Sequence, residues 1–254
     1  MALLEIDDLT VRFHGIAALD GARFRVEAGE VVGLIGPNGA GKTTFFNCLS
    51  RLYTPTQGTI RYEGQDLLRL PVHEIAAHGI SRTFQNLGLF PTMTVRENVM
   101  VGAHHRGRSG FLGAPLRLRR VRDEEARLGQ EADALLSRLS LSEVADHVAA
   151  GLPYGTLKRV ELARALAAQP RLLLLDEPAN GLSHAEVGEL AEVIRAIRRD
   201  FDITMVVVEH HMGFVMGLSD RVVCLDLGRV IAEGTPDEVQ RDPAVVEAYL
   251  GVAA

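Results

Sequence analysis

A glycine-rich segment at residues 36–43 constrains the fold of this chain more than any other feature. It consists of Gly36, Pro37, Asn38, Gly39, Ala40, Gly41, Lys42 and Thr43. The segment directly follows an apolar run at residues 31–35, which is typical of a strand buried on both faces of a parallel sheet. A helix is expected to begin near Lys42, since Phe45, Phe46 and Leu49 follow at helical spacing. Buried strand, glycine-rich turn and helix, in this order, are the context that a phosphate-binding loop requires.

The chemistry of such a loop assigns roles to its last residues. Consecutive backbone N–H groups point at phosphate oxygens, and the dipole of the following helix adds to the attraction. Lys42 is expected to reach the β- and γ-phosphates of a nucleotide, the hydroxyl of Thr43 to hold Mg²⁺, and Thr44 to contribute a further nucleotide contact. The alternative is a glycine-rich turn that matches by chance, which the flanking strand and helix make the weaker interpretation.

Two carboxylates follow a second apolar run, at residues 172–175. Asp176, at the end of this expected strand, is predicted to face the Mg²⁺ through water, and Glu177 to orient or deprotonate an attacking water. The alternative is a pair of acids that ends a strand before Pro178. The presence of a phosphate loop favours the catalytic interpretation.

The remaining apolar patterns predict an α/β fold. Residues 3–13 and 22–26 alternate and are rich in β-branched side chains, which indicates a small antiparallel sheet near the N-terminus. A third buried strand is expected at residues 204–208. The helix expected between the strands at 172–175 and 204–208 has apolar residues three and four apart: Val187, Leu190, Ile194, Ile197 and Phe201. Alternation of buried strands with amphipathic helices predicts a three-layer core.

Two segments depart from this alternation. Residues 86–152 show helical patterning, no strong buried strand and a glycine-rich insert at 104–115, so we predict a helical subdomain inserted into the core. Residues 222–225 and 230–232 flank a short polar turn and predict a hairpin.

Composition excludes some classes of function. The chain has 254 residues and a formal net charge of −6, which argues against nucleic acid as the main partner because that partner requires a basic surface. The longest apolar runs, at residues 172–175 and 203–208, are far shorter than the roughly 20 residues that a membrane-spanning helix needs. The first residues reach acids at once and do not resemble a signal peptide. We therefore expect a protein that does not itself span a membrane.

A further segment narrows the family. Shortly before the two carboxylates the chain reads Leu152, Pro153, Tyr154, Gly155, Thr156, Leu157, Lys158, Arg159, Val160, Glu161, Leu162, Ala163, Arg164, Ala165 and Leu166. This segment resembles the signature and following helix of the ABC ATPases, and the resemblance covers nearly the whole chain. A phosphate loop alone would also fit kinases or GTPases. The resemblance implies a single ABC ATPase domain over residues 1–254, with residues 1–85 and 156–254 forming the α/β core and its antiparallel β-subdomain, and 86–155 forming the helical subdomain.

The same resemblance implies roles for other residues. Gln85 would contact Mg²⁺ and the attacking water, His210 would touch the γ-phosphate, and Phe13 would stack on adenine. Taken singly, Gln85 would carry no signal, His210 would more often be a satisfied polar residue, and Phe13 could be a strand-end core residue. The expected catalytic residues are thus Lys42, Gln85, Glu177 and His210. The expected Mg²⁺ contacts are Thr43, Gln85 and, through water, Asp176. The signature residues expected to contact ATP bound by the other subunit of a dimer are Tyr154, Gly155 and Thr156.

The chain departs from the family pattern within the signature. Pro153, Tyr154 and Thr156 stand where the family usually has serine, glycine and glutamine, and Ser183 stands where aspartate is usual. Proline lacks the hydroxyl that would reach the γ-phosphate across the dimer. The departures leave open how much this signature contributes to the site formed with the other subunit.

One branch of the family is favoured, the branched-chain amino acid importers. The resemblance to that branch lies in four segments: residues 35–47, residues 82–85, the glycine-rich insert after Gly102, and the ending at 234–239 and 248–251. It implies transmembrane permease subunits, a second ATPase subunit (a heterodimer or a homodimer), an indirect link to a substrate-binding protein, and a peripheral location on the cytoplasmic face of the cell membrane. Alternatives are another ABC system, for urea or amide import or lipopolysaccharide export, and a soluble ABC ATPase without a transport role. The sequence does not name the transported substrate.

Overall fold

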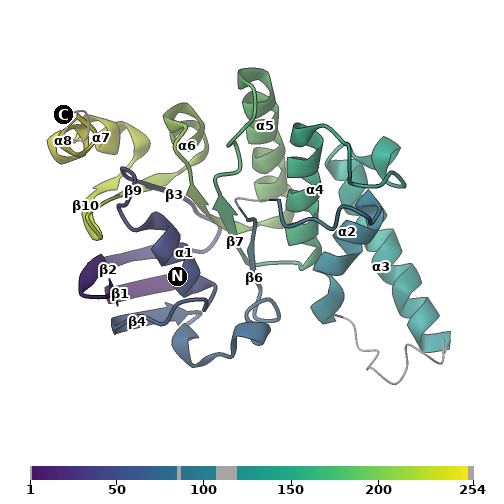
Figure 1. Cartoon of the computed structure of the whole chain (residues 1–254), viewed down its shortest axis with the longest axis horizontal. Helices are drawn as coiled ribbons and strands as arrows, with labels where there is room; N and C mark the ends of the chain where they lie inside the picture. The colour runs from purple at the N-terminus through teal and green to yellow at the C-terminus, as the bar shows by residue number, and fades with distance from the viewer. Residues whose placement is uncertain (1, 85–86, 107–118, 251–254) are drawn as a thin grey trace.

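The computed structural model describes residues 2–84, 87–106 and 119–250, with side chains described at all of these except 119–122. A central six-stranded sheet has helices on one face, and a small antiparallel sheet lies on the other (Figure 1). The helical insertion lies at one end of the central sheet, and the C-terminal helices lie at the other end.

The central sheet has the strand order β10-β9-β3-β8-β7-β6. Its strands are β3 (Val31–Ile35), β6 (Ile80–Arg82), β7 (Leu172–Asp176), β8 (Thr204–Val208), β9 (Arg221–Asp226) and β10 (Arg229–Gly234). All neighbouring pairs are parallel except β9 with β10. Every residue of β3, β7 and β8 is buried, because each strand places alternate side chains in the cores above and below the sheet.

The small antiparallel sheet and helix α1 form a hydrophobic core with one face of the central sheet. The sheet has the order β2-β1-β4-β5, with β1 (Ala2–Phe13), β2 (Ile16–Glu27), β4 (Gln57–Tyr62) and β5 (Gln65–Asp66). Helix α1 (Lys42–Leu49) lies between the two sheets (Figure 1). Phe45 and Phe46 of α1 are fully buried in the same cluster as Leu34 of β3 and Ile60 of β4. This packing fixes the helix that follows the phosphate loop.

The remaining helices cover the other face and the two ends. Their bounds are α2 (Val95–Gly102), α3 (Arg119–Arg138), α4 (Tyr154–Ala167), α5 (His184–Phe201), α6 (Met212–Leu218), α7 (Pro236–Arg241) and α8 (Pro243–Leu250). Short 3-10 turns are η1 (Leu67–Arg69), η2 (Val72–Glu74), η3 (His104–Arg106) and η4 (Ser142–Val144). The buried side of α5 packs in one cluster with Leu173 and Leu175 of β7, and α2 and α3 contact α4.

The predicted fold class is confirmed: an α/β core, an N-terminal antiparallel sheet and a helical insertion. The strands expected at residues 31–35, 172–175 and 204–208 are β3, β7 and β8, and the predicted hairpin is β9 with β10. The sequence did not predict β4 or β6. The expected limit of the helical subdomain, between residues 155 and 156, falls inside α4, which is continuous; the domain limits therefore stay a prediction.

Candidate functional site

The candidate site lies at one edge of the central sheet, where three neighbouring parallel strands end. The glycine-rich loop follows β3, Asp176 and Glu177 end or follow β7, and His210 follows β8. Because the carboxyl ends of parallel strands share an edge, these predicted residues meet although they are far apart in the sequence. Gln85 lies outside the described residues.

Glycine is required at two positions of the phosphate loop. Gly36 has φ 147°, and a Cβ there would lie 2.1 Å from the carbonyl oxygen of Leu225. Gly41 has φ 105°, and a Cβ there would lie 2.4 Å from the carbonyl oxygen of Ala18. Any side chain would therefore push the loop away from its neighbours. The close approach lets the backbone curl tightly enough for its N–H groups to converge.

Lys42 is held inside this loop. Its Nζ donates to the carbonyl oxygens of Gly36 (2.6 Å) and Pro37 (2.9 Å), and the residue is buried. Burial lowers the pKa of Lys42, and the carboxylate of Glu177 acts in the opposite direction. The ammonium group thus lies under the loop. The outward surface of the loop is formed by three exposed residues: Asn38, Gly39 and Thr43.

The two neighbours of this surface complete the loop. Ala40 is buried, and its N–H donates to the carbonyl of Pro37 (3.2 Å), which closes a turn. Thr44 lies half-buried in the first turn of α1. Helix α1 begins at Gly41 without a side-chain cap, so the N–H groups of its first turn have no side-chain acceptor at that position.

Asp176 is paired with an arginine that the sequence did not single out. Its Oδ2 accepts from the guanidinium of Arg82 (2.7 Å), and the side chains are only 6% and 9% exposed. Arg82 also donates to Asn47 (2.8 Å) and Ser50 (3.1 Å), so it connects β6 and β7 with α1. In the sequence, Arg82 is only a charged residue three positions before Gln85. Strand β6 is too short to show a hydrophobic pattern, so the sequence does not indicate that Arg82 lies beside Asp176.

Glu177 and His210, both predicted as catalytic, lie against each other. The Nε2 atom of His210 is 2.7 Å from Oε1 of Glu177, and Nδ2 of Asn180 donates to Oε2 (3.3 Å). Glu177 has φ 48°, and its N–H donates to the carbonyl of Val208 (2.8 Å), so its backbone is joined to the end of β8, two residues before His210. A carboxylate paired with an imidazole can accept and hand on a proton at this edge.

Glu209 is a second residue that sequence reasoning missed. Its side chain is buried and accepts from three backbone N–H groups: Ala179 (2.6 Å), His210 (2.8 Å) and His211 (3.1 Å). It thereby connects the loop after β7 with the loop after β8. An acid placed directly after the apolar run at 204–208 was the available signal.

The signature residues form the start of α4. Pro153 is the N-cap and gives no side-chain hydrogen bond. Tyr154 is 41% exposed, its ring lies 5.7 Å from Nζ of Lys158, and it packs so closely on Gly181 that a Cβ there would lie 2.9 Å from the ring. A Cβ on Gly155 would lie 2.6 Å from Glu186.

The neighbours of Thr156 show how the start of α4 meets α5. Thr156 is half-buried and lines a cavity of about 190 Å³ with Arg159, Leu182 and Glu186. Ser183, which replaces the usual aspartate, caps α5 through a capping box with Glu186. Its hydroxyl therefore has a structural role in this chain.

Phe13 ends β1 with its ring partly exposed. The ring meets that of Tyr53 edge to face, with centroids 5.1 Å apart. An exposed aromatic pair of this kind offers a flat apolar surface on which a base can stack. The role of Phe13 in adenine binding stays a prediction.

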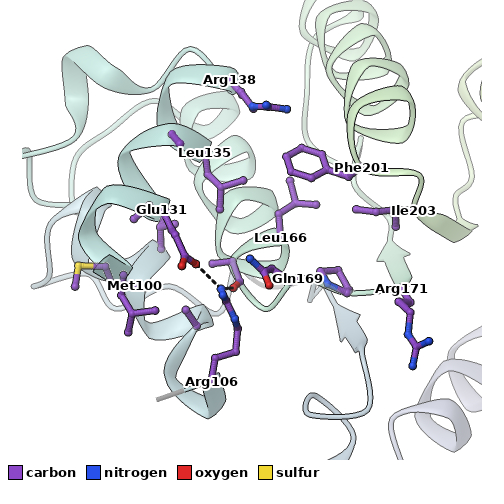
Figure 2. A pocket seen from close by; sticks show the side chains of 17 residues that line it. Met100, Arg106, Glu131, Leu135, Arg138, Leu166, Gln169, Arg171, Phe201 and Ile203 are labelled. Carbon is purple, nitrogen blue, oxygen red and sulfur yellow. Dashed lines mark hydrogen bonds and ion pairs between the residues drawn. The ribbon is translucent and has the colours of Figure 1, made fainter. Parts of the chain in front are cut away.

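A larger cavity lies away from this chemistry. It measures about 460 Å³ and is lined by α2, α3, the C-terminal end of α4, Phe201 and Ile203 (Figure 2). Inside it, Arg106 points at Glu131, with 2.6 Å between the paired atoms. None of the predicted site residues that the structure describes lines it. The signature residues lie at the opposite end of α4, roughly 20 Å away at 1.5 Å per residue.

The described part of the chain lacks two features, a cluster of metal ligands and a membrane-spanning helix. Among those residues, no group of three His, Cys, Asp or Glu side chains could hold a metal ion. No helix in the described ranges has the length and apolar character needed to cross a membrane.

A strand, a glycine-rich loop and a helix, with acids at the ends of the neighbouring strands, define a P-loop nucleoside triphosphatase. Comparison with known proteins then places the chain in the ABC transporter family, whose model matches residues 19–180. A second model, described as a branched-chain amino acid ATP-binding cassette transporter, matches residues 229–254. The chain belongs to the ABC transporter family, and the predicted family resemblance is confirmed.

Three relatives illustrate the match. The high-affinity branched-chain amino acid transport ATP-binding protein BraF of Pseudomonas aeruginosa is 42% identical over 251 residues, covering 99% of this chain and 98% of that protein. The ADP conformation of MJ1267, an ATP-binding cassette of an ABC transporter, is 30% identical with a TM-score of 0.85, covering 99% of both chains. The dimeric post-hydrolysis state of the cassette MJ0796, bound to ADP and Pi, is 25% identical with a TM-score of 0.77, covering 92% of this chain and 98% of that one.

Proposed function

We propose that this chain hydrolyses ATP to energise a transporter that imports branched-chain or related amino acids. The observation that supports the ATPase activity best is the meeting of the phosphate loop, Asp176 and the Glu177–His210 pair at one sheet edge. The branch is supported by the 42% identity to BraF and by the C-terminal family match at residues 229–254.

The phosphate loop supplies the binding part of the mechanism. Its N–H groups and the start of α1 attract phosphate oxygens, and the bends at Gly36 and Gly41 allow the curl. Lys42 already lies under the loop with its donors directed at the carbonyls of Gly36 and Pro37. We infer that it exchanges these acceptors for β- and γ-phosphate oxygens when ATP binds.

The residues present fit Mg²⁺ as a cofactor. The hydroxyl of Thr43 and the carboxylate of Asp176 are oxygen donors, the type this cation prefers, and one or two protein ligands beside phosphate oxygens suffice. Mg²⁺ would supply charge neutralisation on the phosphates. Asp176 is at present paired with Arg82, and that pair would hold the carboxylate in place for the cation or for its bound water. Gln85 completes the proposed set.

Glu177 and His210 provide the proton chemistry. We infer that Glu177 accepts the proton of the attacking water, and that His210 orients Glu177 and touches the γ-phosphate. Two features hold the loops that bear this pair. One is the left-handed backbone at Glu177, and the other is the set of three hydrogen bonds that the Glu209 carboxylate accepts from backbone N–H groups.

A dimer would complete the site. The MJ0796 cassette is dimeric with ADP and Pi bound, and we extend that arrangement to this chain. The start of α4, with Tyr154, Gly155 and Thr156, would face the nucleotide held by the phosphate loop of the other subunit. Further partners would be transmembrane permease subunits and, indirectly, a substrate-binding protein. These partners would hold the chain at the cytoplasmic face of the membrane.

Substitution of Glu177 tests the chemistry. In the purified complex, Glu177→Gln is expected to lower ATP turnover by about 100-fold or more while ATP still binds and holds the dimer closed. Glu143→Gln, at an exposed carboxylate in η4, is the control and should leave turnover unchanged. Rapid hydrolysis by Glu177→Gln would remove Glu177 from the role assigned here.

Co-purification tests the branch and the partners. The chain would be isolated from its native membranes in mild detergent, the bound subunits identified by mass, and ATP turnover measured with and without leucine in the reconstituted complex. Membrane subunits and stimulation by leucine are expected. Isolation of an export assembly, or of the chain alone, would contradict the importer.

A further inference from the structure

The C-terminal end of the chain contacts the first residue of the phosphate loop. The backbone N–H of Gly36 donates to the hydroxyl oxygen of Tyr249, with 2.8 Å between the two atoms and 213 residues between them in the sequence. Tyr249 lies in α8, and its ring packs against a small core cluster that includes Ile35 and Val222. Two distant parts of the chain are thus joined at the point where the candidate site begins.

Gly36 is the point at which the loop leaves the central sheet. The register of β3 with β9 ends at Ile35 and Cys224, so Gly36 is the first residue beyond it. The carbonyl of Gly36 accepts from Lys42 (2.6 Å), and its N–H donates to Tyr249. These two bonds lie on either side of one Cα atom, and together they fix the φ and ψ of a residue in a conformation that only glycine adopts readily.

The environment keeps the Tyr249 hydroxyl in one chemical form. A phenol is neutral near pH 7, and burial raises the pKa of Tyr249 further, to about 12. Gly36 is itself buried. Without the hydroxyl its N–H would lack this acceptor, and a buried N–H without a partner is costly. The loop would then shift to satisfy the group elsewhere.

We propose that Tyr249 is a positioning residue for the phosphate loop, through which the C-terminal helix sets the affinity of the site for ATP. The inference rests on the proposed function, because it takes the loop as the nucleotide site. The proposal also assigns a role to residues 229–254, which contain α8 and match the branched-chain family model. The effect falls on binding more than on chemistry, since Glu177 and His210 follow other strands.

Removal of one oxygen atom tests the proposal. Tyr249→Phe keeps the ring and its packing and deletes the hydroxyl. In the full chain within its complex, the KM for ATP is expected to rise about three- to tenfold, with the dissociation constant of ATP rising in parallel. The kcat is expected to stay within about twofold of the parent value, because the loss falls on binding.

Tyr62→Phe is the matched control. Tyr62 is buried, and its hydroxyl lies beside Gly79 and Arg171 and not at the phosphate loop. This variant should leave KM, kcat and thermal stability close to those of the parent. An unchanged KM and ATP affinity in Tyr249→Phe would overturn the proposal, as would a fall in kcat alone.

A third measurement separates this inference from the proposed function. Hydrogen exchange of the Gly36 amide, followed by NMR without nucleotide, should be faster in Tyr249→Phe than in the parent and in Tyr62→Phe. If the parent chain neither bound nor hydrolysed ATP, the proposed function would fail, and exchange at Gly36 would still test the hydrogen bond. Equal exchange rates in all three proteins would refute the positioning role.

Discussion

Five helices of this molecule fall into two groups by the way in which they begin. Helices α2, α5 and α7 begin with complete capping boxes, in which a hydroxyl and a glutamate satisfy backbone N–H groups: Thr94 with Glu97, Ser183 with Glu186, and Thr235 with Glu238. Helices α1 and α4 begin at Gly41 and Pro153 with no side-chain cap. In the first group, side chains of the protein cap the N-terminal N–H groups of the helix. The helices of the second group begin at the two segments that we assign to phosphate binding.

Helix α6 is intermediate and explains the difference. Its N-cap, His211, gives no side-chain hydrogen bond, but the buried carboxylate of Glu209 accepts from the N–H groups of His210 and His211. Here the chain supplies its own anion. At α1 and α4 we expect the anion to come from the nucleotide, because a cap there would occupy the N–H groups that must bind it. On this interpretation, α1 and α4 each lack about 1 kcal/mol of stabilisation that a side-chain cap would give, and their N–H groups remain available to bind phosphate.

The largest expected effect is at α1. Lys42→Ala removes the ammonium group that lies beneath the phosphate loop, and ATP turnover is expected to fall roughly 100- to 1000-fold. Steady-state hydrolysis in the complex measures it. Lys158→Ala is the comparison, since Lys158 is similarly buried but belongs to α4, where its Nζ donates to the carbonyl of Glu177 (3.4 Å). Equal losses in both variants would break the distinction between the two helix starts.

The next effect is at α6. Glu209→Gln leaves one oxygen to serve three N–H donors, so the free energy of unfolding is expected to fall by about 2 kcal/mol and turnover to fall with it. Urea unfolding measures the first quantity. The exposed substitution Glu143→Gln serves again as the control. Unchanged stability would mean that the carboxylate does not act as the internal anion.

A cap in the first group should matter for stability alone. Thr94→Ala removes the capping hydroxyl of α2, and the free energy of unfolding is expected to drop by about 1 kcal/mol with the KM for ATP unchanged. Urea unfolding and ATP hydrolysis would be measured on the same preparation. A changed KM at full stability would show that a capped helix also serves the nucleotide.

The smallest effect expected is at α4. Pro153→Ser introduces a hydroxyl that can cap the first turn, and the isolated chain is expected to gain about 0.5 kcal/mol of stability. In the assembled dimer the same hydroxyl can reach phosphate, so the KM for ATP should fall. Thermal unfolding of the chain and hydrolysis by the complex separate the two roles. No gain in either would contradict the view that α4 begins with unsatisfied N–H groups.

The sequence predicted those parts of the fold whose signal is local. Strands β3, β7 and β8 are continuous apolar runs because both of their faces are buried. Strand β6 was not predicted, because it has only three residues and two of them, Ser81 and Arg82, are polar. So short a segment shows no hydrophobic periodicity. The phosphate loop, Asp176 and Glu177 were predicted from spacing, and the structure brings Glu177 to His210.

The residues that escaped prediction act through partners far along the chain. Arg82 reaches Asp176 across 94 residues, Glu209 reaches Ala179 across 30, and Tyr249 reaches Gly36 across 213. No pattern in a short window reports such contacts, since each depends on which strand ends lie together. The roles of Arg82, Glu209 and Tyr249 could be inferred only from the three-dimensional structure, which shows which strand ends lie together.

The strand order also has a consequence for how the chain is made. Strand β3 has β8 and β9 as its neighbours, so its first partner, beginning at Thr204, is synthesised about 170 residues later. At roughly 5–20 residues per second, β3 waits on the order of ten seconds or more on the ribosome with its edges unpaired. The apolar residues of α1 need not wait, because β1, β2 and β4 all lie within the first 62 residues and pack against it. The small antiparallel sheet would thus cover the apolar side chains of α1 until the later strands of the central sheet have been synthesised.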